Sequence, residues 1–164
     1  MNNVAIKSLS AENYASFADQ INFTTEIDMS KKEFADNTFG IEDMFFNKVS
    51  FLYGANGSGK TFFCKIIREI QRLLDWSPLS AMGNSQFLSL PQLKGIDAPV
   101  KPFIFDVDYK DKATKFSIEL VIDKITYHYE FSIHGKKIES ELLTKKYRRT
   151  EKIIERTSPS YKDI

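Results

Sequence analysis

The sequence is poor in the residues that build disulfides and metal sites. Of its 164 residues, one is a cysteine, Cys64, and two are histidines, His128 and His134. A single cysteine cannot close an internal disulfide, and this usage fits a reducing compartment. Two histidines and one distant cysteine do not provide a transition-metal ligand set at any recognised spacing. These shortages exclude a disulfide scaffold and a zinc-type site made by this chain alone.

Long hydrophobic runs and a large excess of one charge are also missing. No apolar stretch approaches the roughly 18 residues of a membrane-spanning helix, and Met1-Asn-Asn lacks the basic, then apolar, pattern of a secretory signal. The formal net charge is +1, whereas nucleic-acid-binding faces usually gather far more lysine and arginine. We therefore expect a cytoplasmic globular protein without a membrane partner, forming one domain or part of a larger one.

Glycine is scarce, with 7 residues in the chain, yet three glycines stand within the short segment 54–59. The segment fits the G-x-x-x-x-G-K-[ST] pattern of a phosphate-binding loop. Glycine tolerates the positive φ angles that turn successive backbone N–H groups towards an anion. We predict that the nucleotide site consists of Gly54, Ala55, Asn56, Gly57, Ser58, Gly59, Lys60, Thr61 and Phe62.

Two side chains complete the predicted site. Lys60 is expected to reach the β and γ phosphates of ATP as a mobile point charge, and the Thr61 hydroxyl to serve as a ligand of Mg²⁺. The loop opens directly into a helix, whose N–H groups and positive dipole end face the same phosphates. The sequence therefore predicts ATP and Mg²⁺ as cofactors.

The residues around the loop predict a strand before it and a helix after it. Val49, Phe51 and Leu52 indicate a short buried strand. Apolar residues then recur at helical spacing over about residues 59–75, and Ser77-Pro78 is expected to end the helix, because the residue before proline avoids the helical region. The apolar positions of this helix are Phe63, Ile66, Ile67, Ile70 and Leu74.

The remaining chain reads mostly as strands. Strands are expected at Val4–Leu9 and Ile21–Ile27, followed by a polar loop over about residues 28–43. Beyond Pro102 the apolar period changes to two residues and predicts an antiparallel β-meander, with turns at Asp123-Lys124 and His134-Gly135. On this register His128 points to the polar face of its strand.

These elements predict an α/β fold in two parts. Residues 1–100 are expected to form a P-loop NTPase core, a mixed sheet around the phosphate-loop helix, and residues 101–164 an antiparallel β-subdomain of the same head. The segment 79–93 is ambiguous, and we assign it no function.

Three stretches, in their order and spacing, resemble the N-terminal part of the ABC/SMC-class P-loop ATPases, in particular the AAA-type predicted ATPases related to the OLD family. They are Glu12-Asn-Tyr-Ala-Ser-Phe17, Tyr53-Gly-Ala-Asn-Gly-Ser-Gly-Lys-Thr61 and Pro102-Phe-Ile-Phe-Asp106, and with their spacing they cover most of the chain. The resemblance implies an ATP-hydrolysing head. It also implies an incomplete one, because the glutamine loop, the LSGG-like signature, the apolar run ending in Asp-Glu and the switch histidine of such heads are not found in this sequence.

Two departures from the family pattern bear on the site. The family usually shows an arginine, implicated in nucleotide contact, between the aromatic residue and the serine of the opening motif, where this sequence has Ala15. Asp106 follows Phe103-Ile-Phe without a glutamate after it, so we interpret that stretch as a structural strand rather than as the magnesium-anchoring position. The catalytic residues stay unknown.

We therefore expect an ATP-binding module that needs a C-terminal lobe or a second ATPase head for hydrolysis. One alternative is a nucleotide-binding module that does not hydrolyse at all. Another is a nucleic-acid-associated defence or repair factor, in which Lys145-Lys-Tyr-Arg-Arg149 would contact phosphates, although exposed basic strands also serve to discourage edge pairing.

Overall fold

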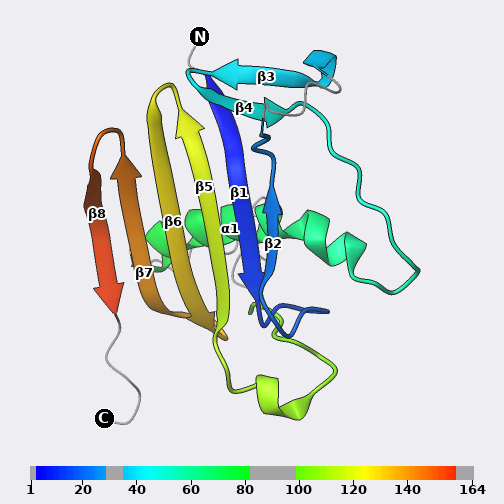
Figure 1. Ribbon diagram of the computed structural model, residues 1–164. Helices are drawn as coiled ribbons and strands as arrows, with labels where there is room; N and C mark the ends of the chain where they lie inside the picture. The colour runs from blue at the N-terminus through cyan, green and yellow to red at the C-terminus, as the bar shows by residue number, and fades with distance from the viewer. Residues whose placement is uncertain (1–2, 29–34, 82–98, 158–164) are drawn as a thin grey trace.

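The computed structural model describes residues 3–28, 35–81 and 99–157. Its centre is a six-stranded sheet in the order β2-β1-β5-β6-β7-β8 (Figure 1). All pairings in this sheet are antiparallel, so the predicted mixed sheet is wrong for the described residues. The strands are β1 (Val4–Glu12), β2 (Ile21–Thr24), β5 (Thr114–Ile122), β6 (Ile125–His134), β7 (Lys137–Lys146) and β8 (Thr150–Thr157).

The predicted meander is confirmed in β5 to β8. Phe116 lies opposite Phe131, and Ile118 lies opposite Tyr129, so the apolar residues of the two strands share one face of the sheet. The alternation carries through both strands because their side chains have a strict period of two. β1 pairs with β5, and the sheet therefore crosses the boundary expected at residue 100; the division into two parts stays a prediction.

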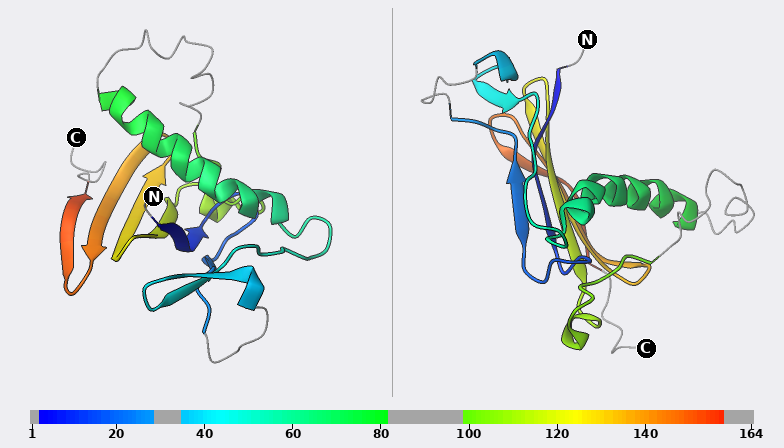
Figure 2. Two further views of the ribbon diagram at one scale, coloured as in Figure 1. Left: turned by 90° about the horizontal axis from the view of Figure 1, so that it is seen from above. Right: turned by 90° about the vertical axis from the view of Figure 1, so that its right-hand side faces the viewer.

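One long helix, α1 (Lys60–Ala81), covers one face of the sheet, as the edge-on view in Figure 2 shows. We expected it to end before Pro78, and it continues through that residue. A proline removes one helical N–H and clashes with the preceding turn, but this disfavours a helix without forbidding it. The rest of the ambiguous segment, beyond residue 81, lies outside the described residues.

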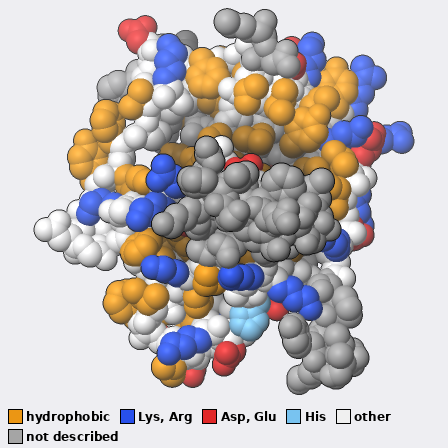
Figure 3. Space-filling model, turned by 180° about the vertical axis from the view of Figure 1, so that it is seen from behind, with side chains coloured by type: hydrophobic (Ala, Val, Ile, Leu, Met, Phe, Trp, Pro, Cys, Tyr) orange, Lys and Arg blue, Asp and Glu red, His pale blue; other side chains and the backbone are white. Residues whose placement is uncertain are grey.

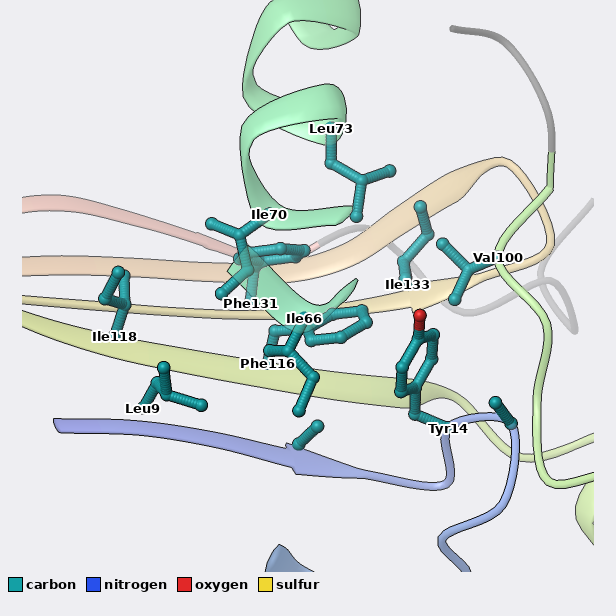
Figure 4. Packing of buried hydrophobic residues seen from close by; sticks show 12 residues of the cluster. Leu9, Tyr14, Ile66, Ile70, Leu73, Val100, Phe116, Ile118, Phe131 and Ile133 are labelled. Atoms are coloured by element: carbon teal, nitrogen blue, oxygen red, sulfur yellow. The ribbon is translucent and has the colours of Figure 1, made fainter. Parts of the chain in front are cut away.

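The main core lies between α1 and the sheet. Ile66, Ile70 and Leu73 are at most 3% exposed and point towards Phe116 and Phe131 on the sheet (Figure 4). Their spacing of four and three residues places them on one stripe of the helix. Two of the apolar positions from which we predicted the helix, Ile67 and Leu74, do not lie on this stripe, since they are 41% and 45% exposed.

A hairpin occupies part of the segment predicted as a polar loop. It consists of β3 (Thr38–Ile41) and β4 (Met44–Asn47), preceded by the 3-10 turn η1 (Ala35–Asn37). Ile41 and Phe46 from the hairpin are buried with Ala5 and Val121. Val121 points away from α1, because its neighbours in β5 face the helix, so the hairpin covers the opposite face at one end of the sheet. The hairpin was not predicted, because its two short strands lie in a segment rich in charged residues and their apolar alternation is brief.

Candidate functional site

The predicted phosphate loop lies immediately before α1 and has the backbone that its glycines allow. Gly57 and Gly59 have φ angles of +82° and +88°, a region that L-residues rarely adopt. At Gly54 the constraint is space, since an added Cβ would lie 2.8 Å from Oγ of Ser58. The three glycines therefore keep the loop narrow and turned, without side chains filling its interior.

Lys60 folds back over the loop. Its Nζ donates hydrogen bonds to the carbonyl oxygens of Gly54 at 2.7 Å and Ala55 at 2.6 Å, and lies 3.5 Å from Oγ of Ser58. The ammonium group is therefore held above the loop by its own backbone oxygens. A phosphate group offers the same ammonium stronger, charged acceptors.

The N-terminal turn of α1 adds backbone donors at the same place. The first bond of the helical pattern runs from N–H of Phe63 to the carbonyl of Gly59, at 2.9 Å. Since helical bonds begin there, the N–H groups of Lys60, Thr61 and Phe62 have no helical acceptor. Together with the loop glycines and Lys60, these donors fit the phosphates of a nucleotide.

A hollow of about 510 Å³ adjoins the loop on the outer side of α1. Among the described residues, its lining combines three cations with a hydroxyl and a thiol and includes no carboxylate: Leu52, Lys60, Thr61, Cys64, Lys65 and Arg68. Viewed from the helix side, Lys and Arg side chains are more prominent than Asp and Glu (Figure 3). The hollow thus has the charge that a polyphosphate requires. Thr61 is exposed at its edge, and the assignment of a Mg²⁺ ion to this hydroxyl stays a prediction.

The segment before the loop is not the buried strand that we predicted. Residues 48–55 form no strand, and Phe51 and Tyr53 are 75% and 86% exposed. Val49 is tied to the turn η1 through a hydrogen bond of 3.1 Å from the Asn37 side chain to its carbonyl. The apolar run is therefore present, but the described part of the chain offers no neighbouring strand at this position.

The opening motif lies against the back of the loop. An added Cβ on Gly59 would be 2.7 Å from Cζ of Phe17 and 3.3 Å from Cβ of Ser16. Ala15, at the position where the family resemblance implies an arginine, is 1% exposed and has a φ of +51°. Its N–H donates to the carbonyl of Lys101 at 3.0 Å, and its own carbonyl accepts from Ile104 at 3.1 Å. The three stretches that carry the family resemblance thus meet in space.

Sequence reasoning missed the central role of Asn13. This residue is 2% exposed, and its Nδ2 donates to the carbonyls of Tyr109 at 3.0 Å and Lys112 at 2.8 Å, while its Oδ1 accepts from N–H of Phe103 at 2.9 Å. Its carbonyl also accepts a 2.7 Å hydrogen bond from the Thr114 hydroxyl. The tolerance of asparagine for its φ of +50° was the one available signal, and it predicts a turn rather than these partners.

Asp106 has a local structural role. We expected a strand up to this residue, but residues 101–106 contain none. The Asp106 carboxylate instead accepts from N–H of Asp108 at 3.0 Å and caps the 3-10 helix η4 (Val107–Tyr109). Aspartate is a preferred N-cap residue, because its carboxylate satisfies a backbone amide of the first turn.

The two histidines lie apart from the loop, on the sheet. His128 is next to Glu119 and Glu130, with closest nitrogen to oxygen distances of 3.8 Å and 3.5 Å. This confirms that His128 points to the polar face, opposite to Tyr127 and Tyr129. Among the described residues no group of three or more His, Cys, Asp or Glu side chains is arranged to hold a metal ion.

The phenol of Tyr14, in the main core cluster, has a perturbed pKa. The pKa of Tyr14 is raised to about 12, first by burial and then by the negative charge of Glu69, against a smaller lowering by the charge of Arg72. The neutral phenol is thus favoured in the folded protein.

Neither α1 nor the short helices of the described segments have the length and hydropathy to cross a bilayer.

Comparison with known proteins identifies the family of the chain. A family model described as "AAA domain, putative AbiEii toxin, Type IV TA system" matches residues 49–163, which include the loop, α1 and the meander. Searches of curated proteins and of solved structures returned no match. The model covers well over half of the chain, and the chain belongs to this family of nucleotide-binding, ATPase-like AAA domains.

Proposed function

We propose that residues 54–62 hold the phosphates of Mg·ATP, and that the chain is the nucleotide-binding part of an ABC/SMC-type ATPase head. One observation carries the proposal: Lys60 Nζ lies within 2.7 Å of two loop carbonyls, above a loop in which Gly57 and Gly59 take positive φ angles. The loop and the first turn of α1 bind the phosphates through backbone N–H groups, and Lys60 neutralises part of their charge. The Thr61 hydroxyl would hold a Mg²⁺ ion, which would supply positive charge to offset that of the phosphates.

The same geometry supports a division of labour with a partner. The residues at the loop bind and orient phosphates, but no carboxylate from the described part of the chain lines the hollow to place a water molecule for attack. Ground-state binding alone does not accelerate hydrolysis, because only interactions that strengthen in the transition state do so. A C-terminal lobe or a second ATPase head would provide those groups.

Isothermal calorimetry with Mg·ATP tests the site. Lys60→Ala should weaken binding by about 2 kcal/mol or more, roughly 30-fold, because a charge-assisted contact to phosphate is lost. Lys124→Ala is the matched control, since it removes an exposed lysine from the β5–β6 turn and should leave affinity unchanged. Equal affinities for the Lys60 variant and the parent chain would refute the proposal.

The single thiol gives an independent readout. Cys64 is exposed and lines the hollow beside Lys60 and Thr61. Mg·ATP bound there should slow its modification by a maleimide severalfold, because the nucleotide covers the thiol. Unchanged labelling at saturating nucleotide would place any bound ATP elsewhere.

A second function, nucleic-acid binding, is favoured by a separate feature. At the turn between β7 and β8 a hollow of about 530 Å³ is lined by Lys145, Arg148, Arg149 and Tyr147, among others, and Tyr147 is 57% exposed. Cations beside an exposed ring suit phosphates and a stacked base. A steep loss of affinity for single-stranded DNA with added salt, reduced by Arg148→Ala, would support this function; salt-independent binding would argue against it.

A further inference from the structure

Strand β8 forms one edge of the sheet, farthest from β2 (Figure 1). All its residues are exposed, including Ile153 and Ile154, which are 47% and 41% accessible. The larger core cluster draws on α1, β1, β5 and β6, with Ile138 of β7 at its margin, so the helix does not cover this edge. Within the described ranges no strand pairs with the outer side of β8, which leaves a row of outward N–H and C=O groups.

The sequence of β8 is complementary to itself when read in opposite directions. The strand reads Thr-Glu-Lys-Ile-Ile-Glu-Arg-Thr over residues 150–157. Two antiparallel copies, centred between the isoleucines, match every acidic residue with a basic one and every apolar residue with an apolar one. The matched pairs are Thr150 with Thr157, Glu151 with Arg156, Lys152 with Glu155, and Ile153 with Ile154.

A β-bulge makes this register geometrically consistent. Directly opposed residues must point to the same face of a sheet, and in a regular strand Glu151 and Arg156, five apart, would point to opposite faces. The pairing of β8 with β7 shifts by one residue between Ile154 and Lys152. Arg156 and Glu151 consequently lie opposite Glu141 and Lys145, which share one face of β7.

The other charged pair meets the same condition on the opposite face. Glu155 and Lys152 lie opposite Leu142 and Thr144 of β7, which share the second face. The threonine pair and the two charged pairs of the proposed register therefore each have both members on one side of the sheet. Ile153 is the extra residue of the bulge, and Ile154, opposite Leu143, lies at the centre of the register and meets Ile154 of the second copy. Without the bulge, the oppositely charged residues would point to opposite faces of the sheet and could not contact each other.

Charges already placed on β7 extend the pattern. Arg156 pairs with Glu141 at 2.8 Å, and Glu151 pairs with Lys145 at 2.9 Å. A second β8 strand would complete a row of charges of alternating sign across β7 and β8 of one copy and β8 and β7 of the other. The row would run from Glu141 and Arg156 of the first copy to Glu151 and Lys145 of the second copy. On the other face, Lys152 and Glu155 form an ion pair within β8. In the dimer, Lys152 of each copy would instead pair with Glu155 of the other copy.

We propose that two copies of this chain associate through β8, antiparallel, to form a continuous sheet across a two-fold axis. Main-chain hydrogen bonds provide the attraction, and the charge pattern selects a second copy over strands with other charges. A two-strand contact is small for an interface, and exposed ion pairs contribute little each, so the dimer is concentration-dependent. The contact does not involve the phosphate loop and should form without nucleotide.

Analytical ultracentrifugation of the full chain over a concentration series, with EDTA and without nucleotide, tests the proposal. The parent chain should show a monomer–dimer equilibrium. Lys152→Glu and Glu155→Lys should each weaken self-association at least tenfold, because each places like charges opposite one another. An equimolar mixture of these two variants should associate at least as well as the parent chain, because in the mixed dimer every reversed charge meets its opposite.

Controls separate this contact from misfolding and from other interfaces. Lys115→Glu reverses an exposed lysine paired with Glu12 in the middle of the sheet, and should leave the dimer unchanged. Circular dichroism melting curves should show that all variants fold. A parent chain that stays monomeric at every concentration, a dimer insensitive to both β8 variants, or a mixture that fails to recover association would each overturn the proposal.

Discussion

The ring of Phe17 lies against the backbone of Gly59, so closely that a Cβ on this glycine would come within 2.7 Å of the ring. The contact joins the turn after β1 to the last residue before α1. Because Gly59 also has a φ of +88°, its backbone is restrained twice, by conformation and by the neighbouring ring.

Gly59→Ala should therefore destabilise the fold more than Gly57→Ala. Both replacements force a residue with a Cβ to keep a positive φ, at a cost of roughly 1–2 kcal/mol. At Gly57 nothing lies within 4 Å of an added Cβ, so the difference between the two variants measures the contact with Phe17. Urea unfolding gives both values, and equal losses of stability would show that the ring moves aside freely.

Asn13→Ala should lower the free energy of unfolding by about 2–4 kcal/mol, since the amide of Phe103 and the carbonyls of Tyr109 and Lys112 would lose their partner. Asn13→Asp keeps an acceptor for Phe103 but cannot donate to the carbonyls, and should also be destabilising. Gln20→Ala, which removes an exposed side-chain hydrogen bond, is the control. If Asn13→Ala proved as mild as this control, the network would contribute little.

Stability should fall between about pH 10 and 12 through Tyr14. Its folded pKa, about 12, lies above the ordinary value of 10.0, so its contribution is complete below pH 10. As the pH rises further, the unfolded chain loses the phenolic proton while the folded chain retains it, and stability drops by up to about 2 kcal/mol. Tyr14→Phe should abolish that part of the pH dependence.

Unfolding free energies at pH 9 and pH 11 measure this effect as a difference between variant and parent, which cancels the titration of other groups. Tyr53→Phe is the control, because Tyr53 is 86% exposed in the folded protein. Parallel pH profiles for Tyr14→Phe and the parent chain would contradict the prediction.

The isolated chain should bind Mg·ATP but hydrolyse it only at a slow background rate. Loss of the element that stabilises charge in phosphoryl transfer typically removes about 10³-fold or more in rate. Phosphate release from a size-selected monomer measures it, with Lys60→Ala as the blank. Turnover of roughly 1 s⁻¹ or more, lost in the variant, would show that the catalytic groups already lie within this chain.

The sequence predicted the local elements well where a regular period governed them. The meander followed from alternation in β5 and β6, and the start of α1 followed from the glycine loop before Lys60. Both patterns are local: a period of two marks a sheet with one buried face, and a glycine-rich turn marks a helix start.

The predictions that were wrong or incomplete concern residues whose structure depends on partners distant in the chain. Residues 49–53 are apolar enough for a strand, but a strand needs a neighbour to pair with, and the described residues place none there. Asn13 reaches residues about 90 positions later, which no local pattern encodes. The short β3–β4 hairpin was hidden among charges because only Ile41 and Phe46 of it are buried.

The two faces of the sheet are closed by very unequal means. α1 seals one face through a cluster of twelve buried residues, whereas the β3–β4 hairpin covers the end of the other with a cluster of four. Opening the hairpin exposes far less apolar surface, so it should detach as a separate cooperative unit at a lower free energy than global unfolding. Amide hydrogens of Phe39 to Phe46 should then exchange with deuterium well before those of β5 and β6, while the body of the sheet stays intact.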